Sequence, residues 1–251
     1  KGQVYVDLNE SGDFDSTDYY AHQIGIVASP ESAYAYTYTD GDYFMNFVDT
    51  VGTYLISAEI PEYWTVSTDS LVYHVVIDTS YTNRDSLDFG LIPDTIINVL
   101  TPDITGGFPR CHSPVTYWLS IDNDGTTVPS GSVHLPLDDS LTYVSSPVMP
   151  DSIVGQDIYW SYDSLAFFST ESINLVVEMP DFESIDDTIW SYLEVLVDSI
   201  PSDDYASRDT LWQIVACAYD PNIKTAIPTG ITDSSFISPD TGELEYLIQF
   251  Q

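Results

Sequence analysis

The chain has 251 residues and a formal net charge of −35 at pH 7, because 40 aspartates and glutamates face only 5 lysines and arginines. Such a surface repels phosphate groups, which excludes nucleic acid as a partner, and it attracts divalent cations; a high-salt habitat would favour the same bias. Hydrophobic residues make up 43% of the chain, too many for a disordered acidic tail, and no stretch of about 18 apolar residues predicts a membrane span.

Residues 1–93 are predicted to form one β module. Tyrosine, valine, isoleucine and threonine favour strands, and no apolar period of 3.6 residues persists long enough to indicate a helix. In Ser32–Thr39, strand periodicity places Tyr34, Tyr36 and Tyr38 on one face. The strands of this module are expected at Gly2–Leu8, Gln23–Ser29, Ser32–Thr39, Asp42–Val48 and Gly52–Glu59.

Residues 94–221 are predicted to form an immunoglobulin-like β sandwich. Several short strands separated by turn signals such as Asn123-Asp124-Gly125 are typical of that architecture. The expected strands are Val115–Ile121, Ser132–Leu137, Leu141–Ser145, Ile173–Glu178, Ile189–Val197 and Leu211–Tyr219. The fold class is therefore all-β, with two sandwich modules in tandem.

Residues 222–251 are predicted to be a linker followed by one isolated strand, Leu244–Phe250. Its apolar positions alternate at Leu244, Tyr246, Ile248 and Phe250, and the strand matches the pattern of Val115–Ile121. A single strand cannot pair its own backbone groups. It would be the first strand of a further module in a longer protein, or a donor strand that inserts into an identical subunit and builds a fibre.

The segment from Asp7 to Asp18 has the spacing of a twelve-residue calcium loop. Oxygen-bearing residues fall at its ligand positions, and Gly12 stands where the loop must turn sharply. The candidate ligands are Asp7, Asn9, Ser11, Asp13 through its backbone carbonyl, Asp15 and Asp18. The alternative is an acidic surface turn in a chain rich in aspartate. The predicted role of Ca²⁺ is structural.

Residues 2–90 resemble the calcium-binding B-type repeats of serine-aspartate-repeat surface adhesins. The pattern G-x-V-x-x-D-x-N-x-x-G-x-x-D begins at Gly2, and the later tyrosine pattern stands at Thr39–Tyr43 and Gly52–Tyr54. Residues 110–251 resemble conserved-repeat immunoglobulin-like modules of large secreted Bacteroidota proteins, through Arg110-Cys111, Tyr117–Gly125 and Cys217–Lys224. These resemblances imply a multi-module exported protein, secreted or held at the cell surface.

The two cysteines, Cys111 and Cys217, suit one disulfide in an oxidising compartment, although two buried thiols would also fit the sequence. A repeated triplet of Asp, then Ser or Thr, then Ala, Ile, Leu, Val, Met or Thr is similar to the O-glycosylation signal of Bacteroidota exported proteins. Local turns that start a strand would explain the same pattern. The hydroxyl residues are Thr50, Ser70, Ser86, Thr95, Ser140, Ser152, Ser164, Thr188, Ser199 and Thr210, with Ser16 the least suitable because it lies inside the calcium loop.

No catalytic motif stands in the sequence. The histidines His22, His74, His112 and His134 lack paired metal spacing, and there is no nucleophile elbow or phosphate-binding glycine loop. The tryptophans Trp64, Trp118, Trp160, Trp190 and Trp212 are expected to fill the cores rather than to bind sugars. We therefore expect a non-enzymatic structural or adhesive surface segment. The alternative is a module that binds a surface polysaccharide or a receptor.

Overall fold

The computed structural model describes residues 1–30, 33–46, 51–78, 84–198, 207–217, 223–227 and 245–249. In this part of the chain the fold is all-β, as predicted, and it contains one short 3₁₀ helix, η1 (Phe182–Ser184). No helix among these residues is long and apolar enough to cross a membrane.

Strands β1 to β9 form the two sheets of the first module. One sheet has the order β2-β1-β9-β7, with β5 also paired to β1. These strands are β2 (Tyr19–Tyr20), β1 (Gly2–Val6), β9 (Phe89–Pro93), β7 (Trp64–Val66) and β5 (Asp42–Tyr43). The other sheet has the order β4-β3-β6-β8. Its strands are β4 (Ala33–Tyr36), β3 (Gly25–Ser29), β6 (Gly52–Ala58) and β8 (Tyr73–Ile77).

The core of the first module follows from the alternation of its strands. Val4 and Val6 on β1, Phe89 and Leu91 on β9 and Ile56 on β6 are buried. Each such side chain contributes roughly 1.5–3 kcal/mol when it leaves water. The predicted tyrosine face points away from this core, because Tyr34, Tyr36 and Tyr38 are all exposed.

Strands β10 to β18 form the second sandwich. One sheet has the order β10-β11-β16-β13, made of β10 (Leu100–Gly106), β11 (Pro114–Asn123), β16 (Thr170–Glu178) and β13 (Thr142–Ser145). The facing sheet has the order β14-β15-β12-β17-β18. Its strands are β14 (Ser152–Val154), β15 (Asp157–Tyr162), β12 (Gly131–Pro136), β17 (Thr188–Val197) and β18 (Ser207–Ile214).

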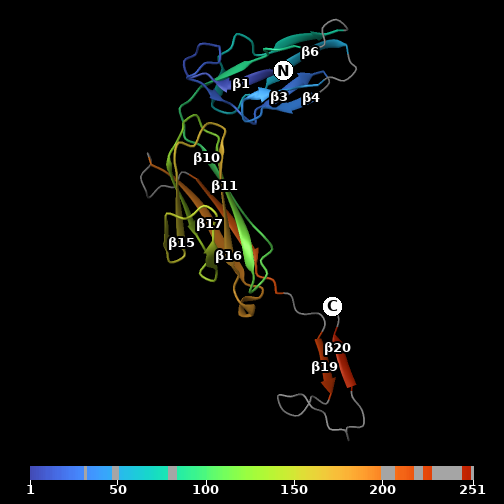
Figure 1. Ribbon diagram of the computed structural model, residues 1–251, viewed down its shortest axis with the longest axis vertical. Coiled ribbons are helices and arrows are strands. Elements are labelled where there is room, and N and C mark those ends of the chain that lie inside the picture. The colour runs from blue at the N-terminus through green and yellow to red at the C-terminus, as the bar shows by residue number, and fades with distance from the viewer. Residues whose placement is uncertain are drawn as a thin grey trace.

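The two sandwiches follow one another along the long axis of the molecule (Figure 1). Phe167, from the loop before β16, is buried against the core of the first module. Its ring centroid lies 5.5 Å from that of Trp64 and 5.4 Å from that of Tyr19, both edge to face. Phe168 adds a contact to Trp64 at 5.0 Å. The second module thus inserts an aromatic side chain into the first.

The C-terminal strand differs from its prediction, because it is not isolated. Strand β20 (Glu245–Gln249) pairs antiparallel with β19 (Ile223–Ile227), a strand that the sequence analysis had placed in the linker. The pairing has a physical reason, since a lone strand leaves all its backbone donors and acceptors without partners. Of the four proposed donor positions, Tyr246 is exposed and Ile248 lies within β20. Leu244 and Phe250 lie outside the described residues.

Several strands begin or end away from their predicted limits. The segment predicted at Leu211–Tyr219 forms β18, which begins at Ser207 and ends at Ile214. Beyond it, Ala216 makes a parallel bridge with Arg110. Strand β10 was missed because Pro102, a residue type uncommon within strands, stands inside it. Its alternation nevertheless buries Leu100 and Ile104.

Candidate metal site

The predicted calcium loop connects β1 to β2. Asp7 follows β1 directly, is fully buried, and donates its backbone amide to the carbonyl of Leu91 on β9 at 2.8 Å. Asp18 precedes β2, whose Tyr19 is paired with Val6 of β1. Both ends of the loop are therefore fixed by the same sheet.

The carboxylates of Asp7 and Asp18 organise the loop through backbone amides. Asp7 Oδ1 accepts from the amide of Ser11 at 3.0 Å, and Asp7 Oδ2 accepts from that of Gly12 at 2.8 Å. Gly12 has φ of 79°, a left-handed conformation that glycine adopts without strain. Asp18 accepts from the amides of Leu8 and Asp15, at 3.1 and 2.9 Å.

The other predicted ligands lie in the same loop and contact one another. Asn9 donates its side-chain amide to Asp15 Oδ2 at 2.8 Å, and the Ser11 hydroxyl donates to the carbonyl of Asp13 at 2.8 Å. Hydrogen bonds from the backbone amide and hydroxyl of Thr17, and from Asn9, hold the pKa of Asp15 below its usual range. The loop is thus a closed turn of hydrogen-bonded acidic residues.

The donor set fits a hard cation in chemistry, because every predicted ligand atom is an oxygen. Each oxygen of Asp7 and Asp18 keeps a lone pair beyond its amide contact. The geometry is less complete. Among the described residues, no three carboxylate, imidazole or thiol side chains converge closely enough to hold a metal ion. Calcium binding would require the Asn9–Asp15 and Ser11–Asp13 contacts to open toward the ion.

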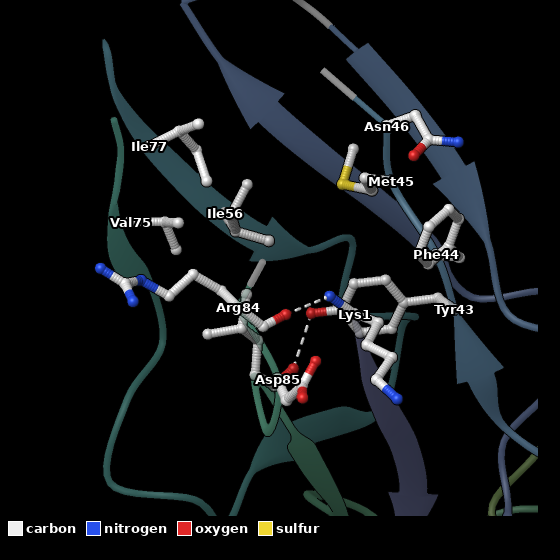
Figure 2. Close-up of a pocket in the computed structure, with 11 residues that line it drawn as sticks. Lys1, Tyr43, Phe44, Met45, Asn46, Ile56, Val75, Ile77, Arg84 and Asp85 are labelled. Carbon is white, nitrogen blue, oxygen red and sulfur yellow. Dashed lines mark hydrogen bonds between the residues drawn. The ribbon is translucent and has the colours of Figure 1, made fainter. Parts of the chain in front are cut away.

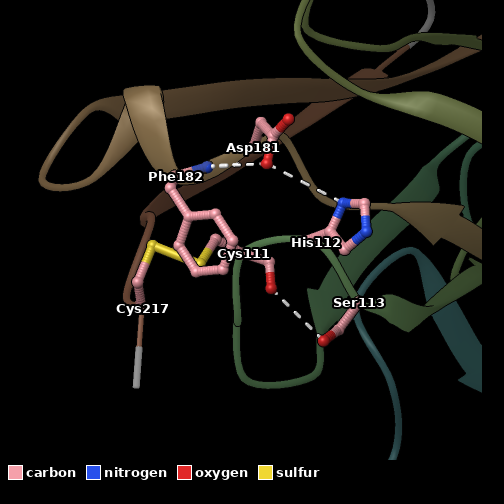
Figure 3. The surroundings of a disulfide bond; sticks show 6 residues. All are labelled: Cys111, His112, Ser113, Asp181, Phe182 and Cys217. Atoms are coloured by element: carbon pink, nitrogen blue, oxygen red, sulfur yellow. Dashed lines mark hydrogen bonds and ion pairs between the residues drawn. A yellow bond between two sulfur atoms is a disulfide. The ribbon is translucent and has the colours of Figure 1, made fainter. Parts of the chain in front are cut away.

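Cys111 and Cys217 form a disulfide, with their Cα atoms 5.1 Å apart (Figure 3). The bond ties the loop after β10 to the segment that leaves β18. A backbone hydrogen bond from Cys111 to the carbonyl of Ala216, at 3.0 Å, supports the same junction. The exposed ring of Phe182 lies nearby and stacks on His112 at 6.4 Å.

The triplet hydroxyl residues lie mostly on the surface. The exposed residues are Ser16, Ser86, Thr95, Ser140, Ser152, Ser164, Thr188 and Thr210, while Ser70 is half-buried and Thr50 and Ser199 lie outside the described residues. Two of these hydroxyls hydrogen-bond to nearby carboxylates. Ser140 donates to Asp138 at 2.7 Å and Ser164 donates to Asp163 at 3.0 Å.

The tryptophans correct the prediction that they fill the cores. Trp64 and Trp160 are buried, as expected. Trp118, Trp190 and Trp212 are 47%, 44% and 59% exposed. The signal was present in the sequence, because alternation that buries Tyr117 and Leu119 must turn the residue between them outward. The same parity along β17 turns Trp190 outward.

His134 occupies an arrangement that sequence spacing did not predict. Its Nδ1 lies 2.8 Å from Glu194 Oε2 on β17, and its Nε2 lies 2.8 Å from Asp157 Oδ1 on β15. The ring also stacks on Tyr159 at 4.5 Å. Strand pairing explains the cluster, since His134 is directly opposite both Glu194 and Tyr159.

A cleft of about 430 Å³ with both polar and apolar lining residues opens in the first module (Figure 2). It is lined by Met45, Ile56, Val75 and Ile77, with Arg84 and Lys1 at its polar side. Strand β8, which carries Val75 and Ile77, ends the sheet order on this side. The cleft therefore lies beside an edge strand.

No protein-family model matches the chain, and no curated protein is similar to it in sequence. Among solved structures, the major pilin subunit BcpA of Bacillus cereus has 11% identity and a TM-score of 0.40, over 90% of this chain and 71% of the pilin. The major pilin SpaD of Corynebacterium diphtheriae has 10% identity and a TM-score of 0.35, over 90% and 68%. A DUF3823 family protein of Bacteroides ovatus has 10% identity and a TM-score of 0.27, over 86% and 100%. Likeness at this level assigns neither a family nor a function to the chain.

Proposed function

We propose that the chain is a structural or adhesive segment of a secreted bacterial surface protein, working as a stiff spacer. The observation that carries the proposal is the junction between the modules, where Phe167 is buried against Trp64 and Tyr19. Such a contact resists bending between two sandwiches, because bending would expose the aromatic ring to water. The disulfide supports an oxidising, extracellular setting.

Calcium in the Asp7–Asp18 loop would add to this stiffness. Asp18 directly precedes Tyr19, and the Tyr19 ring packs edge to face on Phe167. An ion that fixed the loop would also fix the position of Tyr19 at the junction. It would offset the mutual repulsion of Asp7, Asp13, Asp15 and Asp18 as well.

Thermal unfolding with calcium and with a chelator tests the calcium part of the proposal. At a calcium concentration about 100 times Kd, binding stabilises the folded state by about 2.7 kcal/mol. We expect this to raise the Tm of the chain on the order of 10 °C. D15N/D18N should lose the shift, while D139N, a change to an exposed acid in the second module, should keep it. A Tm that is the same in calcium and chelator would refute the calcium site.

A donor strand at the C-terminus would let identical subunits form a fibre. Support comes from β19 and β20, since a two-stranded hairpin is only marginally stable alone and gains from joining another sheet edge. Strand β8, which ends its sheet beside the cleft, offers such an edge. Electron microscopy of the chain with and without residues 240–251 tests this. Filaments only with the segment present support polymerisation, and monomers in both cases exclude it.

Sugars on the triplet hydroxyls would add bulk and solvation to the same surface. Exposed positions such as Ser152, Thr95 and Thr210 support this part of the proposal. The mass of the intact protein from its native source decides it. A mass above that of the bare polypeptide by whole sugar units is expected. A mass equal to the polypeptide excludes glycosylation.

A further inference from the structure

The outward face of the sheet β14-β15-β12-β17-β18 carries two exposed tryptophans side by side. Trp190 on β17 is directly opposite Trp212 on β18 in the strand register. They are 44% and 59% exposed. Tyr192, two residues along β17, shares their face, and Ile214 on β18 is exposed beyond them. Trp190, Tyr192, Trp212 and Ile214 form the apolar part of this face.

A set of ordered polar groups continues the same face. Arg208 is directly opposite Glu194, with Nη1 3.6 Å from Glu194 Oε1. The Arg208 guanidinium lies 3.9 Å from the centre of the Tyr192 ring. His134 then links Glu194 to Asp157 through contacts of 2.8 Å on each side. These contacts hold the donors and acceptors in place before any ligand arrives, which lowers the entropic cost of binding.

The two parts together form a strip that runs along β17 and β18 and reaches β12 and β15 at its polar end. From Ile214 to Arg208 the strand rises about 20 Å. Several sugar rings in a row would fit that length. The strip lies on an open sheet face, so it suits an extended chain better than a single small molecule.

The chemistry of the strip restricts the ligand. A net charge of −35 repels acidic polymers. The exposed aromatic rings lie beside charged and hydrogen-bonding groups on the same sheet face. One face of a sugar ring presents C–H groups that pack on an indole, and its hydroxyls both donate and accept hydrogen bonds.

We propose that this strip binds a neutral polysaccharide. Trp190 and Trp212 stack against sugar rings. Arg208 and Asp157, whose side chains are 46% and 43% exposed, hydrogen-bond to the hydroxyls, and the buried Glu194 holds Arg208 in place. The inference goes beyond the proposed spacer function, because a spacer needs no ligand on its side.

Affinity electrophoresis in native gels tests the proposal. The full chain, produced in a host that adds no sugars to Thr188 and Thr210, is run through gels containing laminarin, hydroxyethylcellulose, galactomannan or pullulan. Its charge drives it rapidly toward the anode, so retardation by a neutral polymer is directly visible. We expect retardation by at least one of the four and none by alginate, which is anionic. No retardation by any neutral polymer overturns the proposal.

The tryptophans are then changed one at a time and together. W190A and W212A should each weaken the binding about three- to tenfold, and W190A/W212A should abolish it. W118A is the matched control, since Trp118 is equally exposed but lies on the opposite sheet. Binding that survives W190A/W212A, or that W118A weakens as much, contradicts the assignment.

If W190A/W212A does not fold, W212A alone and the indole fluorescence of the unaltered chain decide the question. Titration with the retarding polymer should change the fluorescence of the unaltered chain and of W118A, and change that of W212A less. An equal change in W212A overturns the proposal. The calcium shift in Tm should be unaffected by these variants, so failure here leaves the spacer proposal intact.

Discussion

Asp138 shows how single carboxylates stabilise an otherwise self-repelling chain. Burial acts to raise the pKa of Asp138, but the backbone amides of Ser140 and Trp190 and the hydroxyl of Ser140 outweigh it and hold the pKa below its usual range. The contacts are 3.0, 3.0 and 2.7 Å long. A lowered pKa in the folded state means that the charged form of Asp138 stabilises the fold.

The sign of the pH effect follows from that direction. The stabilisation is present above the unfolded-state pKa of about 3.9 and is lost as the pH falls through the lower folded pKa. We expect D138N to reduce the free energy of unfolding at pH 7 by about 1 kcal/mol. The difference between the two proteins should shrink below about pH 4. Denaturant unfolding across the acid range measures it, with D139N as the control at an exposed neighbour. A difference that stays constant with pH would refute the role.

At the scale of the element, His134 connects its own strand, β12, to the neighbouring strands β15 and β17. Its two ring nitrogens lie 2.8 Å from Asp157 and from Glu194, so one side chain contacts both neighbouring strands. Glu194 is only 5% exposed, so removing His134 leaves a buried carboxylate with Arg208 at 3.6 Å. We expect H134A to lower the free energy of unfolding by about 3 kcal/mol. A double-mutant cycle with E194Q measures the pair, and strictly additive losses would show that the contact contributes nothing.

The strands most accessible to prediction were those with simple alternation. Ile173–Glu178 and Ile189–Val197 lie within β16 and β17, because every second residue faces the core and all of these except Ser191 are apolar. Strand β10 alternates in the same way but was missed because Pro102 argues against a strand. The exposed tryptophans were misjudged for a different reason. Burial was assigned from residue type, although the parity of Leu119 and Leu193 already turned Trp118 and Trp190 outward.

The candidate sites also differ in how far the sequence alone predicts them. The acidic loop could be found from the sequence because all its members are close in the chain, from Asp7 to Asp18. The strip around Trp190 could not, because strand pairing alone brings His134, Asp157 and Arg208 to Glu194. The spacing of motifs in the sequence does not show which strands become neighbours. The insertion of Phe167 into the other module could not be predicted for the same reason, because it depends on contacts between residues far apart in the chain.

At the scale of the whole molecule, Phe167 determines whether the two modules move as one. Its side chain is 6% exposed and packs on residues of the other module. We expect F167A to cost about 3 kcal/mol and to separate the melting of the two modules into two calorimetric transitions. Small-angle scattering should show a broader range of shapes. F182A, which removes an exposed phenylalanine of the second module, should change neither. One unchanged transition in F167A would contradict a junction held by this side chain.

The disulfide determines which strands of the second module would bear a pulling force. Cys111 and Cys217 are 106 residues apart in the chain, and the bond lets force pass directly between them. A pull on the two ends therefore loads the segment up to Cys111 and the segment after Cys217, and it bypasses the strands from β11 to β18. β10 stays on the loaded path, because it precedes Cys111.

Single-molecule stretching tests this path. With the bond intact, unfolding of the second module should release little length. Under reducing conditions the bypassed residues join the path and add on the order of 350 Å, since an extended residue spans about 3.3–3.6 Å. C111A/C217A should show the longer extension without reductant. Equal extensions in oxidised and reduced protein would mean that the bond does not shield the sandwich. A spacer built on this sandwich would then yield under load through all of its strands.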